Sequence, residues 1–243
     1  MALALSLEAL RARFPANFPA ALAAESRGTL PLGWAELDAA LPEGGLPRGV
    51  IELSAPHALG GSTTVALAAV RAAQKKDPRA WCAWIDPDGT LYPPGVAMAG
   101  VDLDRLLIVR PPRQDVGRMA VKVAAARACD VIVVDMDPVP GASSVACAHR
   151  KRKKSWPPEV LVRKLALSAA EGSVSILLLT DALLPRAVSW PVALRLELTR
   201  GHDSLSVRVA KDRRGHIGLA KTQIPLRTRP RLEDDFREAG EGA

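Results

Sequence analysis

The stretch VIELSAPHALGGSTTVALAAVRAAQ, residues 50–74, decides the fold class. Residues 50–54 are apolar enough for a short buried strand, and residues 55–61 form a loop that contains two glycines. Residues 62–74 carry small and apolar side chains that are typical of a buried helix. A strand that passes through such a loop into a helix is the repeating unit of α/β proteins. We therefore expect an α/β fold.

The same kind of strand recurs along the chain. Continuous apolar runs lie at residues 81–85, within residues 104–109 (LLIV), and at residues 131–134 and 176–179. Helices are expected between them, most clearly at residues 115–129, and a short one before them at residues 34–41. Strands without polar alternation are covered on both faces, which predicts a mostly parallel sheet with helices on both faces.

The last strands differ in pattern. Residues 194–198 and 205–210 alternate apolar and polar side chains, and Gly201 lies between them. Such a pair predicts a terminal antiparallel hairpin.

The chain of 243 residues, 48% of them hydrophobic, is long enough for one sizeable core. We expect an N-terminal helical segment over residues 1–29, the core over residues 30–225 and a flexible charged tail over residues 226–243. A helix over residues 4–14 has an apolar stripe that packs either on its own domain or on another protein: Leu3, Leu7, Leu10 and Phe14.

The net charge of +7 is concentrated in one segment. Five consecutive cations supply most of it: Arg150, Lys151, Arg152, Lys153 and Lys154. Clustered cations suit contacts with DNA phosphates, and the nearby Trp156 is able to stack on an unpaired base. The alternative is a solvated loop without a ligand.

Other features exclude several classes of protein. The three cysteines have no CxxC spacing, so we predict neither a disulfide framework nor a metal site. No apolar run approaches the ~20 residues that a membrane span needs, and the N-terminus lacks the basic start of a secretory signal. These observations predict a soluble cytoplasmic protein.

The segment PHALGGST, residues 56–63, lies where a phosphate-binding loop is expected. In the pattern G-x-x-x-x-G-K-[ST], Pro56 replaces the first glycine and Ser62 replaces the lysine, while Gly61 and Thr63 fit. Gly60, Gly61 and the start of the following helix are still able to hold an anion weakly. The alternative is a glycine-containing turn that binds nothing.

Carboxylates follow two of the predicted strands. DVIVVD, residues 130–135, ends in Asp135 and has the form of a strand that places a carboxylate near Mg²⁺. Asp86 and Asp88 follow another strand, where either side chain would orient a water molecule or cap the turn DPDG.

In their order along the chain, several segments resemble the bacterial recombinase RecA. They are LPLGWAELDAALPEGGLPRG (30–49), WIDPDGTL (84–91), GVDLDRLLIVRP (100–111), DVIVVD (130–135) and SVRVAKDR (206–213). The resemblance implies a RecA-like P-loop NTPase core. It places Asp88 at the position of the catalytic glutamate, and Lys211 and Arg213 at positions that contact the ATP of a neighbouring protomer.

The departures from RecA point to a different role. The lysine of the phosphate-binding loop is replaced by Ser62, Asp181 stands in place of the switch glutamine, and the long second DNA-binding loop is absent. A shortened RecA relative of this kind is similar to the ImuA family. That resemblance implies action in translesion DNA synthesis with RecA, an ImuB-type Y-family polymerase homologue and an error-prone DnaE-type polymerase.

We therefore predict a nucleoid-associated, non-catalytic adaptor in DNA-damage tolerance that binds DNA with low sequence preference and needs no cofactor. One alternative is a divergent RecA-type DNA-dependent ATPase that retains ATP binding. Another, compatible with the adaptor, is a regulator that limits the growth of RecA filaments.

Overall fold

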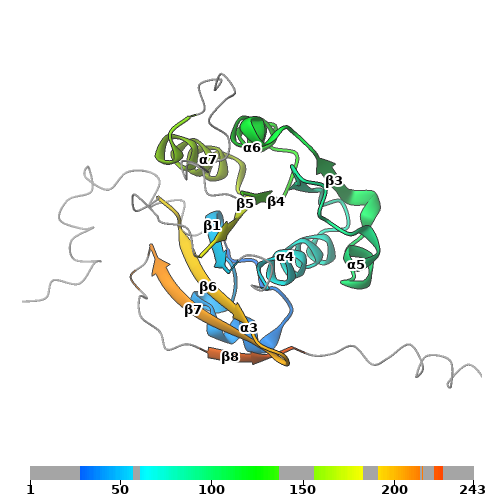
Figure 1. Cartoon of the computed structure of the whole chain (residues 1–243), viewed down its shortest axis with the longest axis vertical. Coiled ribbons are helices and arrows are strands. Elements are labelled where there is room, and N and C mark those ends of the chain that lie inside the picture. Colours follow the sequence, from blue (N-terminus) through cyan, green and yellow to red (C-terminus); the bar gives the residue numbers. More distant parts are fainter. Residues whose placement is uncertain are drawn as a thin grey trace, which may run out of the picture.

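One eight-stranded sheet, with the strand order β3-β2-β4-β5-β1-β6-β7-β8, organises the protein (Figure 1). The structure is a computed structural model and describes residues 28–56, 61–136, 156–182, 191–213, 215 and 222–226. The strands are β1 Gly49–Ala55, β2 Cys82–Ile85, β3 Leu106–Val109, β4 Val131–Asp135, β5 Ser175–Asp181, β6 Leu194–Arg200, β7 Ser204–Asp212 and β8 Thr222–Pro225.

The first six strands in this order are parallel, and the last two pairings are antiparallel. The predicted terminal hairpin is confirmed as β6 and β7, which pair antiparallel. Strand β8 adds a third antiparallel member that the sequence pattern did not reveal. Its segment TQIP is short, and only Ile224 is buried.

Helices cover both faces of the sheet, as predicted (Figure 1). Helices α6 and α7 pack against a core cluster that includes Ile132, Ile176 and Leu165, and α4 packs against a second cluster with Leu53 and Leu205. The helices are α3 Ala35–Ala40, α4 Ser62–Lys76, α5 Pro93–Met98, α6 Val116–Ala125 and α7 Pro158–Gly172, with 3-10 turns η3 Pro42–Gly44, η4 Leu103–Arg105 and η5 Arg113–Asp115. The α/β prediction is therefore confirmed.

Two details differ from the sequence-based expectation. The helix expected over residues 115–129 ends at Ala125, and Arg127 then takes a left-handed conformation with φ +54°. Strand β3 is apolar but lies at the edge of the sheet, where Leu107 is 47% and Ile108 is 37% exposed. The helical cover is thus incomplete at this edge. The sequence did not predict this, because a continuous apolar run does not distinguish an edge strand from a central one.

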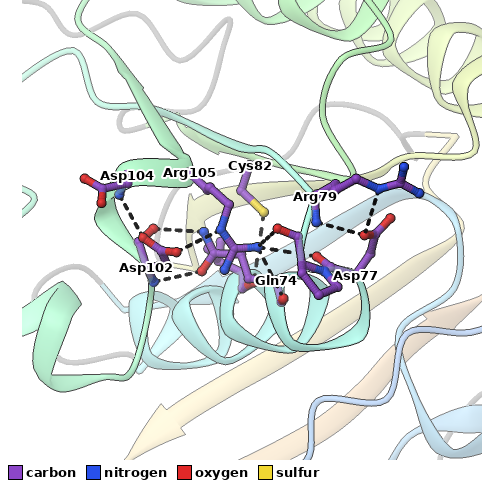
Figure 2. Close-up of polar contacts among 9 residues, drawn as sticks. Gln74, Asp77, Arg79, Cys82, Asp102, Asp104 and Arg105 are labelled. Atoms are coloured by element: carbon purple, nitrogen blue, oxygen red, sulfur yellow. Dashed lines mark hydrogen bonds and ion pairs between the residues drawn. The ribbon is translucent and has the colours of Figure 1, made fainter.

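The C-terminal end of α4 is tied to the segment before β3 (Figure 2). The buried Gln74 Nε2 donates to the Asp102 carbonyl oxygen at 2.9 Å, and the Asp102 N–H donates back to Gln74 Oε1 at 2.9 Å. Arg105 Nη1 donates to the Pro78 carbonyl oxygen at 2.6 Å, and Arg105 Nε donates to Asp102 Oδ2 at 2.8 Å. These contacts fix the direction of α4 and hence the position of its N-terminus beside β1.

Candidate functional site

The carboxyl ends of the parallel strands meet at one edge of the sheet, where ligands bind in α/β proteins of this kind. Asp135 and Asp181 are the last residues of β4 and β5, which are neighbours. Asp181 is in register with Ala55, the last residue of β1. Asp135 therefore lies at the edge where the sequence predicted a carboxylate near Mg²⁺.

The phosphate-binding loop is described at its two ends, Pro56 and Gly61, and Gly60 lies outside the described residues. Gly61 immediately precedes α4 and has φ +70°, a conformation that favours glycine. A Cβ at Gly61 would lie 2.7 Å from Leu205 Cδ1 of β7. Because Leu205 is fully buried, it fills the space beside the helix start and cannot easily move away.

The loop pattern also fits one residue earlier than the sequence analysis placed it. In that frame Ala55 replaces the first glycine, Gly60 and Ser62 match, and Gly61 stands at the lysine position. Leu205 occupies the space that a side chain at this position would need. Both frames therefore lack the lysine, and both leave a hydroxyl residue at the start of α4, either Thr63 or Ser62.

Asp86 is the residue that caps the turn after β2. Its buried carboxylate accepts hydrogen bonds from the backbone N–H of Thr90 at 3.0 Å and of Leu91 at 3.2 Å. The guanidinium of Arg110 lies 3.8 Å from Asp86 Oδ2. The capping role that the DPDG turn allowed is therefore confirmed for Asp86.

Asp88 stands where the resemblance to RecA places a catalytic carboxylate. It forms a two-pronged ion pair with Arg113, in which Arg113 Nε donates to Oδ1 at 2.8 Å and Nη2 donates to Oδ2. Both carboxylate oxygens are thus engaged by one guanidinium. A water molecule oriented by Asp88 would therefore have to compete with the guanidinium for these oxygens.

A buried ion pair that sequence analysis missed lies inside the sheet. Glu52 of β1 is fully buried, and its Oε2 accepts from Arg195 Nε of β6 at 2.6 Å, while its Oε1 accepts from Thr180 Oγ1 at 3.0 Å. No local spacing reveals this pair, because its partners are 143 residues apart in the chain. A glutamate within the apolar segment VIELS is the only signal that could have suggested it.

Lys211 is the penultimate residue of β7 and Arg213 directly follows the strand, at the end of β7 away from the start of α4. Strand β7 is antiparallel to β6, so its end, Asp212, is in register with Leu194 at the start of β6. Lys211 is in register with Arg195, and burial, followed by the nearby Arg195 charge, lowers the pKa of Lys211 below its usual range. The pair therefore lies far from its own loop, as a contact with another molecule would require.

The candidate DNA-binding segment is described only at Trp156, because residues 150–154 lie outside the described ranges. Trp156 precedes α7 and packs half-buried against the core beneath α6 and α7. Lys164 Nζ lies 4.0 Å from the centroid of its ring. A base that stacks on this ring would have to use a face that the lysine leaves open.

The apolar stripe of Leu3, Leu7, Leu10 and Phe14 also lies outside the described ranges.

Thiol and metal chemistry have no support within the described residues. Cys82 is buried and Cys129 half-buried, both as free thiols, and burial raises the pKa of Cys82 to about 12 and also raises that of Cys129. In the described ranges, no three His, Cys, Asp or Glu side chains gather as metal ligands would. None of the described helices has the length and apolarity to cross a membrane.

Comparison with known proteins agrees with this geometry. The profile of the RecA N-terminal domain family matches residues 20–143, just over half of the chain. The chain is similar to the RecA proteins of Kineococcus radiotolerans (44% identical over 111 residues) and Acidiphilium cryptum (45% over 104 residues). These matches cover 44% and 41% of this chain, but only 30% and 29% of the relatives.

The matched region contains β1, α4, β2, β3 and β4, and so includes Asp135 and the start of α4, whereas Asp181 of β5 lies beyond it. The chain therefore belongs to the RecA N-terminal domain family.

Proposed function

We propose that this protein is a non-catalytic RecA-like adaptor in DNA-damage tolerance, which binds DNA together with RecA or with translesion polymerase partners. The observation that carries the proposal is the start of α4. Gly61 or Ser62 replaces the lysine of the phosphate-binding loop, and Leu205 fills the adjacent space. In this proposal the chain keeps surfaces for RecA-type partners but lacks the charge that holds the nucleotide phosphates.

The ion pair between Asp88 and Arg113 supports the same proposal. Hydrolysis of a phosphoanhydride needs a group that orients the attacking water as well as cations on the transferred phosphoryl group. Arg113 engages both oxygens of Asp88, and Asp86 caps its turn. Neither carboxylate is therefore poised for that task.

The second candidate function is that of a divergent RecA-type ATPase. Asp135 at the end of β4 favours it, because this is the place of a carboxylate that binds Mg²⁺. Arg200, at the end of β6, also favours it, since its Cβ lies 3.8 Å from the position of a Cβ on Gly61. A guanidinium there would supply positive charge from a different element.

The adaptor is proposed to join a RecA protomer through one face and to offer a poor face for the next subunit. RecA-type assembly is heterologous, so each subunit presents two different faces and a defect in one face stops growth. Lys211 and Arg213 lie at the end of β7 away from the degenerate loop. In this arrangement they contact the ATP of the neighbouring RecA, whereas the loop of this chain offers no ATP to a further subunit.

RecA-driven strand exchange tests this proposal. We expect substoichiometric inhibition by the wild-type protein, and relief of inhibition when Lys211 and Arg213 are both replaced by Ala. The matched control replaces the exposed Lys75 and Lys76 on α4, which removes the same charge elsewhere. Pull-down of RecA and of ImuB-type and DnaE-type polymerases, with and without DNA, identifies the partner. No inhibition at equimolar protein, together with no capture of any of the three, would overturn the adaptor role.

DNA binding is expected to depend on residues 150–154. Replacing Arg150, Lys151, Arg152, Lys153 and Lys154 by Ala should weaken binding to single and double strands. It should also reduce the steepness of the plot of log binding constant against log salt concentration by about 0.7–0.9 for each phosphate that the variant no longer neutralises. The measurement is fluorescence anisotropy at several salt concentrations. A control that replaces Lys75, Lys76 and Arg79 reports the effect per charge removed from another surface. Equal effects per charge would show that residues 150–154 are a solvated loop.

A further inference from the structure

We propose that a basic hollow beside β3 binds the acidic C-terminal segment of a second copy of this chain. The hollow has a volume of about 440 Å³ and follows the end of β3 into the start of α6. Its lining includes three cations and apolar groups: Arg110, Arg118, Lys122, Val109, Pro111 and Met119. We call it the α6 hollow.

The charges of the α6 hollow are unbalanced. Arg118 and Lys122 are exposed and one helical turn apart, an arrangement of like charges that destabilises a helix. Helix α6 contains no acidic residue, and Asp115 is the only carboxylate among the residues that line the hollow. Within the described residues, neither Arg118 nor Lys122 forms an ion pair. An acidic ligand would relieve this repulsion.

The same edge of the sheet also exposes apolar surface. Leu107 of β3 is 47% exposed, and the hollow itself is lined by the apolar side chains of Val109 and Met119. A ligand that combines carboxylates with large apolar side chains would therefore match both properties. A purely anionic ligand such as a nucleic-acid backbone would use only the cations.

The C-terminal segment of the chain has this chemistry. In RLEDDFRE, residues 231–238, the acids Glu233, Asp234 and Asp235 stand between Leu232 and Phe236. This is the only run of three consecutive acidic residues in the sequence. Its net negative charge complements the hollow, although the chain as a whole carries +7.

Chain length favours a segment from a second copy. The hollow adjoins β3 and the C-terminal segment follows β8, which are the two outermost strands of the eight-stranded sheet. Seven strand spacings amount to about 33 Å. The eight residues from Leu226 to Asp234 span at most ~29 Å when fully extended. A direct path within one chain would demand an almost fully extended segment, which favours the hollow of another copy.

Peptide binding to the full-length protein tests the contact. A fluorescein-labelled peptide of residues 229–243 is expected to bind, and to bind at least tenfold more weakly when Glu233, Asp234 and Asp235 become Gln, Asn and Asn. Arg118→Glu with Lys122→Glu should weaken binding to a similar extent. The matched reversal Lys75→Glu with Lys76→Glu should leave binding unchanged. Equal weakening in the two protein variants, or no binding by the wild type, would overturn the proposal.

Complementation then tests whether two copies are involved. The hollow-reversed variant keeps its tail, and the tail-neutralised variant keeps its hollow. In sedimentation velocity we expect neither to associate alone and the mixture to form a one-to-one complex. If the mixture stays monomeric, the contact between copies is refuted. A third outcome is that duplex DNA displaces the peptide, and that Arg118→Glu with Lys122→Glu weakens DNA binding as much as peptide binding. The α6 hollow is then a nucleic-acid surface and the proposal fails.

Discussion

Replacing Arg195 by alanine is expected to lower the free energy of unfolding by about 3–5 kcal/mol, because it leaves the carboxylate of Glu52 buried without its cation. Glu52 is fully buried in the middle of the sheet, and Arg195 donates to it at 2.6 Å. Thr180 Oγ1 would still donate to Glu52 Oε1, but a neutral hydroxyl does not replace the guanidinium. Urea unfolding followed by circular dichroism measures the change.

Two comparisons separate this effect from the loss of a large side chain. The double variant Glu52→Leu with Arg195→Leu should recover most of the stability, because apolar pairs often replace buried ion pairs without net cost. Arg208→Ala removes the guanidinium from a pair with Glu197 whose side chains are 50% and 37% exposed, and should cost less than about 1 kcal/mol. If Arg195→Ala lowers the free energy of unfolding no more than Arg208→Ala does, the Glu52–Arg195 pair contributes little to stability.

ATP hydrolysis by the purified protein is expected to be at least about a thousandfold slower than that of RecA, with or without single-stranded DNA. Phosphoryl transfer depends on fixed cations that stabilise the transferred group, and removing even one preorganised donor costs on the order of 100- to 1,000-fold. Here the lysine is missing and Arg113 engages Asp88. Phosphate release measures turnover, and calorimetry with MgATP measures binding.

A lysine at position 62 should not restore turnover, because Pro56 and the packing of Leu205 against Gly61 remain. Asp135→Asn is the decisive variant, and Asp130→Asn at the other end of the same segment is its matched control. RecA-like turnover that Asp135→Asn abolishes and Asp130→Asn preserves would establish the divergent ATPase instead. Turnover unaffected by either variant would come from a contaminant.

The fold was predictable where the signal is local. The apolar runs that became β2, β4 and β5, and the small-residue helix α4, stand out because buried elements of a parallel sheet need continuous apolar sequence. Strand β8 was missed because its four residues bury only Ile224. The exposure of Leu107 was missed because position at an edge depends on strand order, which no local pattern encodes.

The residues of the candidate site were likewise predictable only where the signal is local in the sequence. The cap formed by Asp86 follows from the turn sequence DPDG, and Asp135 follows from a strand that ends in an acid. The contact of Leu205 with Gly61 and the Glu52–Arg195 pair join residues more than 140 positions apart. Such contacts exist only once the sheet has assembled, so single-sequence patterns cannot predict them.

The packing of Leu205 against Gly61 limits which single substitutions the start of α4 tolerates. A lysine introduced at position 61 would force a left-handed backbone on a residue with a side chain, at a cost of roughly 1–2 kcal/mol, and would bring that side chain against Leu205. Shortening Leu205 first would open a cavity in the core and cost about 2–5 kcal/mol. Either order passes through a less stable intermediate, so two compensating changes would be needed to place a lysine at position 61.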